Sequence, residues 1–216
     1  MIKGIIFDLD GTLLDTIGDL HESMNKMLSM YKFPTVDRQT VIDNIGHGAD
    51  DFVFGCLPED DRYLTEDYLK LYMEILNNCG LKSTNLFEGI KDSLKYLNNN
   101  NYKLAILSNK PQKSTEIAYN KFLNEFKFDY ITGQKQNDLP KPDATVLKKI
   151  IKKFGLENDE VVIVGDGEAD VLVAKNGNIK QIAVLWGYRT KTQLKNVGAI
   201  NFAQDTNELI SLIKSI

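Results

Sequence analysis

Four aspartates in this sequence stand directly after apolar runs that are predicted to be buried strands. Asp8 and Asp10 follow the run in KGIIFDLDGT, and Asp166 and Asp170 follow the run in VVIVGDGEAD. Carboxylates gathered at one place are costly to bury unless a cation neutralises them. Magnesium suits such a site because it binds a few carboxylates and keeps positions for water and substrate phosphate. The pattern therefore predicts one shared Mg²⁺ site.

Side chains that could hold an anion follow another predicted strand. Ser108, Asn109 and Lys110 come at the end of KLAILSNK, and Lys141 precedes a predicted helix in LPKPD. Taken singly, such features have ordinary explanations: an Asp-Gly pair is commonly a turn, and an acidic residue at a helix start is commonly a cap. Ligands of open α/β sheets bind outside the carboxyl ends of the strands. The coincidence of these groups at several strand ends therefore predicts one site for an anionic ligand.

Strands and helices alternate along most of the chain, and these elements must position the site. Buried strands are predicted at 2–7, 103–108, 160–165 and 180–186, with a shorter one at 128–133. Helical patterns occupy 89–100, 112–123, 143–155 and 168–177. The strands lack polar and apolar alternation, as parallel strands covered on both faces do. The predicted fold class is therefore α/β, with a doubly wound, Rossmann-like parallel sheet core.

Residues 16–82 interrupt this alternation because they contain amphipathic helical segments and no good strand. A crossover between parallel strands needs only about a dozen residues. We therefore expect an inserted all-helical cap domain at 16–82 and an α/β core formed by 1–15 and 83–216. The two connections, near 14–17 and 82–86, are expected to act as hinges that let the cap close over a bound ligand.

Charge and hydropathy exclude several classes of partner. The net charge is −4 and no basic block occurs, so we expect no nucleic-acid partner. No apolar stretch approaches the length needed to span a bilayer, so we expect no membrane association. These features predict a soluble, cytoplasmic protein, a monomer or small homo-oligomer, that acts on a small molecule.

The motifs, in this order, resemble those of the haloacid dehalogenase superfamily of phosphotransferases. DLDGT at 8–12 is similar to its first motif, LSN at 107–109 to its second, Lys141 to its third, and GDGEAD at 165–170 to its fourth. The helical insertion resembles a C1-type cap. One departure is Gly167, where relatives often carry Ser or Thr. The resemblance implies a magnesium-dependent phosphomonoester hydrolase.

The resemblance also implies a role for each motif residue. Asp8 would be the nucleophile that forms an aspartyl-phosphate, and Asp10 the general acid and base, with Lys141 offsetting the negative charge. The implied metal ligands are Asp8, Asp10 through its carbonyl, Asp166 and Asp170. The implied phosphate-binding residues are Thr12, Ser108, Asn109 and Lys141. An aspartate at position 10 favours phosphoryl chemistry over dehalogenation.

Two further stretches resemble phosphoglycolate phosphatases of this superfamily. They are the turn Gly46-His47-Gly48 in the insertion and SNKP at 108–111. Gly46, His47, Gly48 and Lys110 are therefore predicted to set substrate specificity, with His47 or Lys110 meeting a substrate carboxylate. His21 is expected to pack or face solvent. The alternatives are a β-phosphoglucomutase-like phosphotransferase, a pyrophosphatase or nucleotidase, and a non-enzymatic binding module.

Overall fold

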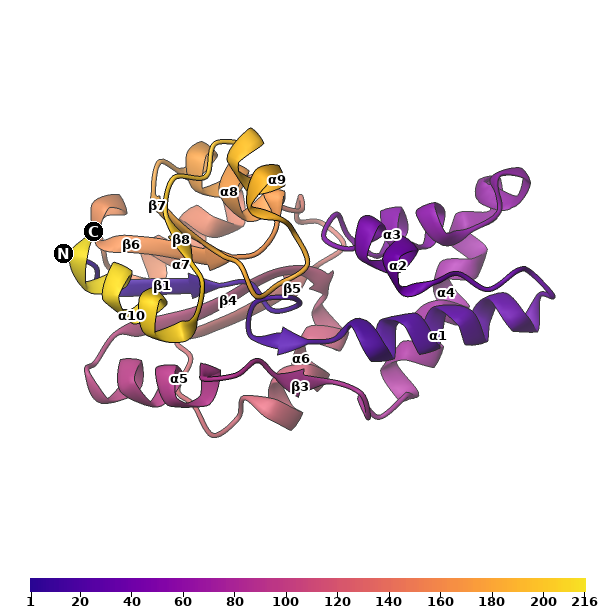
Figure 1. Cartoon of the computed structure of the whole chain (residues 1–216), viewed down its shortest axis with the longest axis horizontal. Coiled ribbons are helices and arrows are strands. Elements are labelled where there is room, and N and C mark those ends of the chain that lie inside the picture. Colours follow the sequence, from indigo (N-terminus) through magenta and orange to yellow (C-terminus); the bar gives the residue numbers. More distant parts are fainter.

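A six-stranded parallel sheet forms the centre of the structure, a computed structural model that describes residues 1–216 (Figure 1). Its spatial strand order is β5-β4-β1-β6-β7-β8. The strands are β1 (Gly4–Phe7), β4 (Lys103–Pro111), β5 (Tyr130–Gln134), β6 (Val161–Gly165), β7 (Lys180–Val184) and β8 (Phe202–Ala203). The predicted α/β fold class with a Rossmann-like parallel sheet is confirmed. Only the two-residue edge strand β8 has no counterpart among the predicted strands.

Helices cover both faces of this sheet, which is why its central strands β1 and β6 contain only apolar residues and glycine. One layer consists of α5 (Ile90–Asn99), α6 (Gln112–Phe122) and α10 (Thr206–Ser215). The other consists of α7 (Thr145–Phe154), α8 (Glu168–Gly177) and α9 (Lys191–Asn196). In β1 the side chains of Ile5 and Phe7 join the first layer, whereas Ile6 joins the second. All three are fully buried, as expected for a central strand.

Strand register brings the predicted site residues to one edge. Phe7 of β1 lies level with Ile106 of β4 on one side and Val164 of β6 on the other. The Asp8 amide continues the ladder by donating to the Val164 carbonyl at 2.9 Å. The residues that come after Phe7, Ile106 and Val164 therefore emerge side by side, although they come from distant parts of the sequence.

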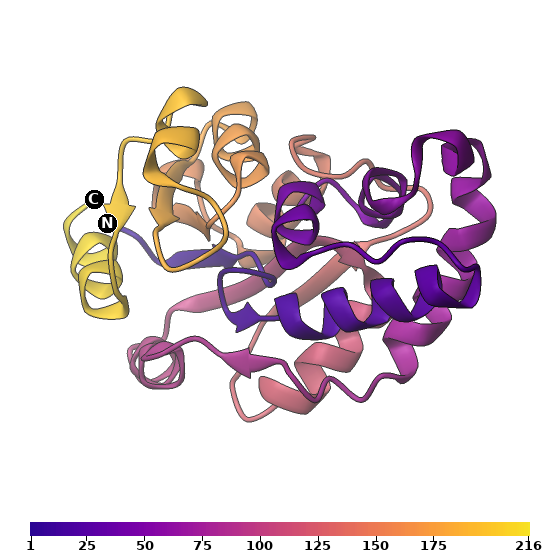
Figure 2. The same ribbon diagram turned by 45° about the vertical axis from the view of Figure 1, so that its right-hand side comes forward.

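Between β1 and β4 the chain leaves the sheet and forms a separate group of helices (Figures 1 and 2). They are α1 (Ile17–Met30), α2 (Arg38–Asn44), α3 (Ala49–Cys56), a 3₁₀ helix (Glu59–Leu64) and α4 (Thr65–Asn78). These helices share their own apolar core, which includes Met24, Met27, Val53 and Tyr72. We refer to residues 17–78 as the helical insertion.

Two short strands, absent from the sequence prediction, join the insertion to the sheet domain. Strand β2 (Leu14–Asp15) pairs antiparallel with β3 (Asn85–Leu86). Close by, the buried Asp19 carboxylate accepts from the amides of Lys82 and Ser83 at 3.0 and 3.1 Å and from the Thr84 hydroxyl at 2.6 Å. The outgoing and returning segments are therefore tied to each other. Pairs of two residues carry too little periodicity for a sequence pattern to reveal them.

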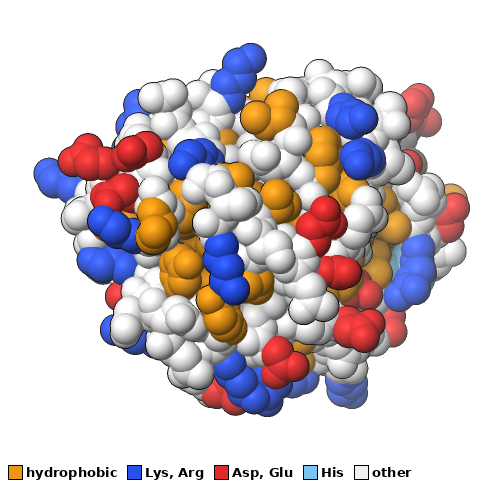
Figure 3. Space-filling view, turned by 60° about the vertical axis from the view of Figure 1, so that its left-hand side comes forward, with side chains coloured by type: hydrophobic (Ala, Val, Ile, Leu, Met, Phe, Trp, Pro, Cys, Tyr) orange, Lys and Arg blue, Asp and Glu red, His pale blue; other side chains and the backbone are white.

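The surface at the end of the sheet domain that holds both termini carries no continuous basic area. Figure 3 shows acidic and basic side chains intermingled there, with apolar side chains between them. This face lacks the clustered Lys and Arg that bind a nucleic-acid backbone. None of the helices combines the length and apolarity that crossing a bilayer requires.

The Asp19 contacts generate a stability prediction. Asp19→Ala should lower the free energy of unfolding by about 3 kcal/mol, because two backbone amides and the buried Thr84 hydroxyl lose a shared charged acceptor. Glu22→Ala is the matched control: Glu22 lies on the same helix and contacts the Ser83 hydroxyl at 3.2 Å, but it is exposed. Its loss should cost less than about 1 kcal/mol. Urea unfolding of both variants measures the difference, and equal losses would contradict the assignment.

Candidate active site

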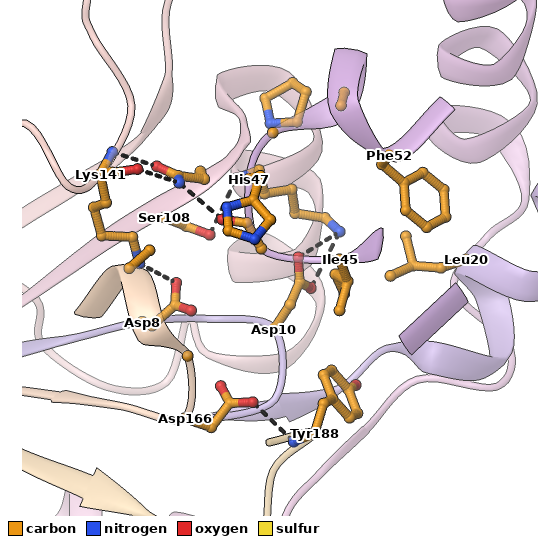
Figure 4. A pocket seen from close by; sticks show the side chains of 18 of the residues that line it. Asp8, Asp10, Leu20, Ile45, His47, Phe52, Ser108, Lys141, Asp166 and Tyr188 are labelled. Carbon is orange, nitrogen blue, oxygen red and sulfur yellow. Dashed lines mark hydrogen bonds and ion pairs between the residues drawn. The ribbon is translucent and has the colours of Figure 1, made fainter. Parts of the chain in front are cut away.

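The strand ends and the insertion enclose a cleft with about 770 Å³ of empty space (Figure 4). Almost every predicted site residue lines it. They are Asp8, Asp10, Gly46, His47, Gly48, Ser108, Asn109, Lys110, Lys141, Asp166 and Asp170. Thr12 is the exception, since it is fully buried beneath the cleft wall. The structure thus brings together residues from five separate stretches of the chain.

Three carboxylates form the floor of the cleft. Asp8, Asp166 and Asp170 each offer an oxygen, and these oxygens lie within 4.8 Å of one another. Gly11 makes the close approach feasible: it has φ +82°, and a Cβ atom there would lie 2.3 Å from Asp166 Oδ2. Any other residue would push the loop after β1 away from Asp166.

Asp166 is fixed on both of its oxygens. Oδ1 accepts from the Thr12 hydroxyl at 2.9 Å, and Oδ2 accepts from the Tyr188 amide at 2.8 Å. Burial raises the pKa of Asp166 to about 7, and the negative charge of Asp8 adds to the rise. The carboxylate is thus held in place while its negative charge remains poorly compensated by the protein.

Asp8 has one oxygen that lacks a hydrogen-bond donor although it is buried. Lys141 Nζ lies 2.9 Å from this Oδ1, close enough for charge attraction but outside hydrogen-bonding alignment. Burial raises the pKa of Asp8 to about 6, with Lys141 opposing the rise and Asp170 adding to it. An unpartnered buried oxygen beside a second carboxylate of raised pKa fits a hard divalent cation.

Lys141 is the cation that the chain itself supplies to this cluster. Besides Asp8, it contacts Asp170 Oδ1 at 2.7 Å, and its side chain is only 2% exposed. Burial alone would lower the pKa of Lys141, but the charges of Asp170 and Asp8 outweigh it and raise that pKa above its ordinary value. Lys141 therefore stays charged and is held between the two carboxylates.

Asp170 has partners on both oxygens, because Oδ2 accepts from the Gly167 amide at 3.0 Å. This bond is the half of a capping box that Asp170 supplies; Gly167 has no side chain to accept from the first amides of α8, which is the half that a hydroxyl at position 167 would add. Asp170 remains within reach of a shared ion, but its contacts chiefly position Lys141.

A second ion pair stands at the side of the cleft nearer the insertion. Lys110 Nζ lies 3.1 and 3.0 Å from the two oxygens of Asp10, and the side chains are 4% and 12% exposed. Figure 4 shows Asp10 turned toward Leu20 and Phe52 of the insertion, away from Asp8. The two aspartates of the first motif thus serve separate parts of the cleft.

Two of the residues predicted to bind phosphate, Asn109 and Thr12, have side chains that contact protein groups in this structure. Asn109 donates to the carbonyls of Gly46 and Lys141 at 2.9 and 3.0 Å and accepts from the Lys141 amide at 2.7 Å. Its side chain has no donor left for phosphate. The Thr12 hydroxyl likewise donates its hydrogen to Asp166 Oδ1. Ser108 accepts from the Lys110 amide at 3.2 Å, and its hydroxyl hydrogen is not engaged by a protein acceptor.

The predicted specificity turn lies over the carboxylates. Gly46 and Gly48 have φ of +112° and +113°, which favours glycine at both positions, and His47 between them is exposed. His21, in contrast, contacts the Val36 carbonyl at 2.9 Å inside the insertion and does not line the cleft.

Sequence reasoning missed other residues that shape the cleft. Tyr188 and Arg189 follow β7, and Glu168 begins α8; all three line the cleft. The signal that could have found Tyr188 and Arg189 was their position just beyond a buried strand, at the edge where ligands bind. The insertion contributes a mostly apolar wall made of Leu20, Ile45, Phe52, Tyr72, Met73 and Leu76.

Proteins of similar sequence include phosphatases, the class of enzyme that the motifs indicate. A phosphoglycolate phosphatase from Vibrio cholerae is 29% identical over 98% of this chain and 97% of its own length. Phosphoglycolate phosphatase 1 from Pseudomonas aeruginosa is 31% identical over 85% of this chain and 70% of its own.

Solved structures share the complete fold. One from Lactobacillus delbrueckii subsp. bulgaricus, with a provisional phosphoglycolate phosphatase assignment, has a TM-score of 0.88 and 26% identity over 98% of both chains. A haloacid dehalogenase-like family hydrolase from Streptococcus pneumoniae has a TM-score of 0.83 and 25% identity, also over 98% of both chains. The haloacid dehalogenase-like hydrolase family model matches residues 5–184. With its motif residues gathered in one cleft, the chain belongs to the haloacid dehalogenase-like hydrolases.

Proposed function

We propose that this protein hydrolyses a small phosphomonoester in two steps, with Asp8 carrying the phosphoryl group between them. The observation that carries the proposal is the state of Asp8. It has a buried oxygen without a hydrogen-bond donor, it lies beside Lys141, and it stands two residues from a second carboxylate that faces the insertion. The phosphatase names of the relatives from two bacterial genera support the same reaction class.

In the first step an Asp8 oxygen attacks phosphorus, and the bond from phosphorus to the ester oxygen breaks. Asp10 donates a proton to that departing oxygen, so the alcohol leaves neutral. In the second step Asp10 takes a proton from water, whose oxygen attacks phosphorus and restores the Asp8 carboxylate as phosphate leaves. Lys141 and the Ser108 hydroxyl stabilise the charge on the transferring oxygens.

The residues that would hold Mg²⁺ are Asp8, Asp166 and the Asp10 carbonyl, with Asp170 close by. When bound, the ion offsets the repulsion between the carboxylates and the phosphate and polarises the phosphoryl group. Asp8 and Asp166 suit this task because Asp8 shares Lys141 with Asp170, and the buried Asp166 is contacted by the neutral donors of Thr12 and Tyr188.

Phosphoglycolate is the substrate that we favour. Among the cations of the cleft, Lys141 pairs with both Asp8 and Asp170 and Arg189 pairs with Glu168, whereas Lys110 pairs only with Asp10, which is proposed to lie on the side of the leaving alcohol. A carboxylate one methylene away from the ester oxygen could reach Lys110 while Asp10 protonates that oxygen. The names of the relatives agree with this choice.

A second candidate substrate class follows from the apolar wall of the insertion. Leu20, Phe52 and Leu76 would favour an alcohol that carries an apolar group over a sugar with many hydroxyls. This wall gives little support to the β-phosphoglucomutase-like alternative, which needs polar contacts to a sugar phosphate. Nucleotide and pyrophosphate hydrolysis remain possible results of a substrate panel.

Asp8→Asn should abolish phosphate release from every phosphomonoester, because the amide is a poor nucleophile and loses the negative charge that holds the ion. Chelation of Mg²⁺ should abolish the activity of the unaltered protein in the same assay. Asp159→Asn is the matched control, since Asp159 is exposed just before β6, at the far end of the sheet. Full activity of the Asp8 variant would exclude the covalent route.

Lys110→Met should lower the kcat/KM for phosphoglycolate relative to that for p-nitrophenyl phosphate by about 10- to 100-fold, the cost of one charged hydrogen bond. The ratio of two substrates measured on one preparation is independent of the active fraction. Lys113→Met, three residues on and exposed, is the control. An unchanged ratio would remove the carboxylate role of Lys110, and interconversion of hexose phosphates without net phosphate release would favour the mutase.

The raised pKa values of Asp8 and Asp166, about 6 and about 7, predict how pH affects the metal-free protein. Unfolded aspartate titrates near pH 4, so between about pH 4 and 7 the folded state binds more protons and its stability falls as pH rises. A cation binds the deprotonated carboxylates and therefore stabilises more at high pH.

Saturating Mg²⁺ should accordingly raise Tm by about 5–10 °C at pH 8, where both carboxylates are charged, and by far less at pH 5. Thermal unfolding with and without the ion measures both shifts. Asp166→Asn should remove most of the shift at pH 8. Equal shifts at the two pH values would refute the assignment of these carboxylates as the ion site.

A further inference from the structure

Arg189 belongs to the sheet domain, but its guanidinium group reaches the helical insertion. It follows β7, and its side chain is 8% exposed. Nη1 donates to the Ile42 carbonyl at 2.8 Å, and Nη2 donates to the Ile45 carbonyl at 2.7 Å. Nε donates to Glu168 Oε2 at 2.9 Å. One buried cation therefore joins two carbonyls of the insertion to a carboxylate of the sheet domain.

The two carbonyls belong to the end of α2, where the helix itself supplies no donors. The last carbonyls of a helix lack intrahelical partners, and a cation placed there is favoured by the helix dipole. Arg suits this position because its planar fork can serve several acceptors at fixed angles, which a Lys ammonium cannot do equally well. These contacts fix where α2 ends, immediately before the turn at Gly46.

Asn109 provides a second tie to the same turn. Its amide donates to the Gly46 carbonyl at 2.9 Å. Asn109 lies on β4 and Arg189 follows β7, and the sheet order places β1 and β6 between those two strands. The two ties therefore stand on either side of the strands that carry Asp8 and Asp166. Figure 4 shows Ile45 and His47 of the tied segment close to Asp8 and Asp10.

Glu168 connects this contact to the carboxylate cluster. It is the first residue of α8 and lies between Asp166 and Asp170 in the sequence. The position of the insertion is thereby coupled to the same helix start that presents two of the carboxylates. Arg189 is the only side chain of the sheet domain that makes two hydrogen bonds to the end of α2.

We propose that Arg189 is a positioning residue that holds residues 42–48 over the phosphoryl site and so determines how tightly the alcohol part of the substrate is enclosed. The kinetic part of this inference rests on the proposed phosphomonoester hydrolysis. Arg189 touches no reacting atom, and it acts through the turn that it holds. Loss of its donors should loosen this segment without displacing Asp8, Lys141 or Ser108.

Arg189→Met tests the inference, because it keeps the apolar stem and removes every donor. Hydrogen exchange of amides 42–48 should become faster, with the rest of the chain unchanged. The KM for phosphoglycolate or p-nitrophenyl phosphate should rise by about 10-fold or more, since small displacements far from the chemistry carry large kinetic costs. The inhibition constant of inorganic phosphate, which needs only the sheet domain, should change less than about 3-fold.

Arg38→Met is the matched control, since Arg38 is exposed at the opposite end of the same helix. It should leave exchange, KM and phosphate inhibition unchanged. Wild-type exchange and KM in Arg189→Met would overturn the inference, and so would a loss of phosphate affinity as large as the rise in KM, which would indicate general damage to the site.

If the Met variant does not fold, Arg189→Lys tests whether Arg189 positions residues 42–48. Lys keeps the charge but cannot serve all three acceptors, so exchange and KM should shift in the same direction by a smaller amount. A Lys variant identical to the unaltered protein in both measurements would overturn the inference. If the unaltered protein hydrolyses no phosphomonoester, the proposed function fails, and the exchange measurement still decides whether Arg189 holds the segment.

Discussion

Uncompensated negative charge at the carboxyl end of the sheet is the constraint on which the cleft depends. Five carboxylates and three Lys or Arg side chains line it, a formal charge of −2 when all are ionised. A phosphate dianion would not enter such a cleft readily, and burial, the main cause of the raised pKa values of Asp8 and Asp166, adds to the cost of keeping these carboxylates charged. One divalent cation removes it. The charge count of the cleft is therefore a second argument, beside family membership, for the divalent cation that we propose.

The topology explains why so many charges meet without unfolding the chain. Parallel strands end at one edge, so β1, β4 and β6 deliver their following residues to one place, while the apolar strands themselves stay buried between two helical layers. The loops after these strands can approach one another this closely only where a residue has no side chain. A Cβ at Gly165 would lie 2.1 Å from Asp170 Cγ, and one at Gly187 would lie 2.4 Å from the Gly11 carbonyl. The buried apolar strands stabilise the sheet, and the glycines let the carboxylate-bearing loops lie close together.

The sequence alone predicted the sheet, its helices and the residues that gather at the strand ends, because buried strands and motif spacing leave strong local signals. It could not predict what each polar group would contact. Thr12 and Asn109 fit a phosphate-binding pattern, yet their hydrogen bonds go to Asp166, Gly46 and Lys141. The β2–β3 pair was missed because two-residue strands have no periodicity. Arg189 was missed because its acceptors lie about 145 residues earlier in the chain.

Under the proposed function, selection among anionic substrates depends on which carboxylate a substrate anion replaces as the partner of a Lys or Arg side chain in the cleft. Lys110 pairs with Asp10, Lys141 with Asp8 and Asp170, and Arg189 with Glu168. Each Lys or Arg side chain of the cleft therefore already contacts a carboxylate, and a substrate anion that binds one of them must share or replace that carboxylate. Under the proposed mechanism the exchange would occur at Lys110, because its partner Asp10 is the group proposed to protonate the leaving oxygen. The apolar wall opposite offers no alternative partner, so an anionic group on the alcohol is directed toward Lys110, and an uncharged alcohol depends on apolar contact alone.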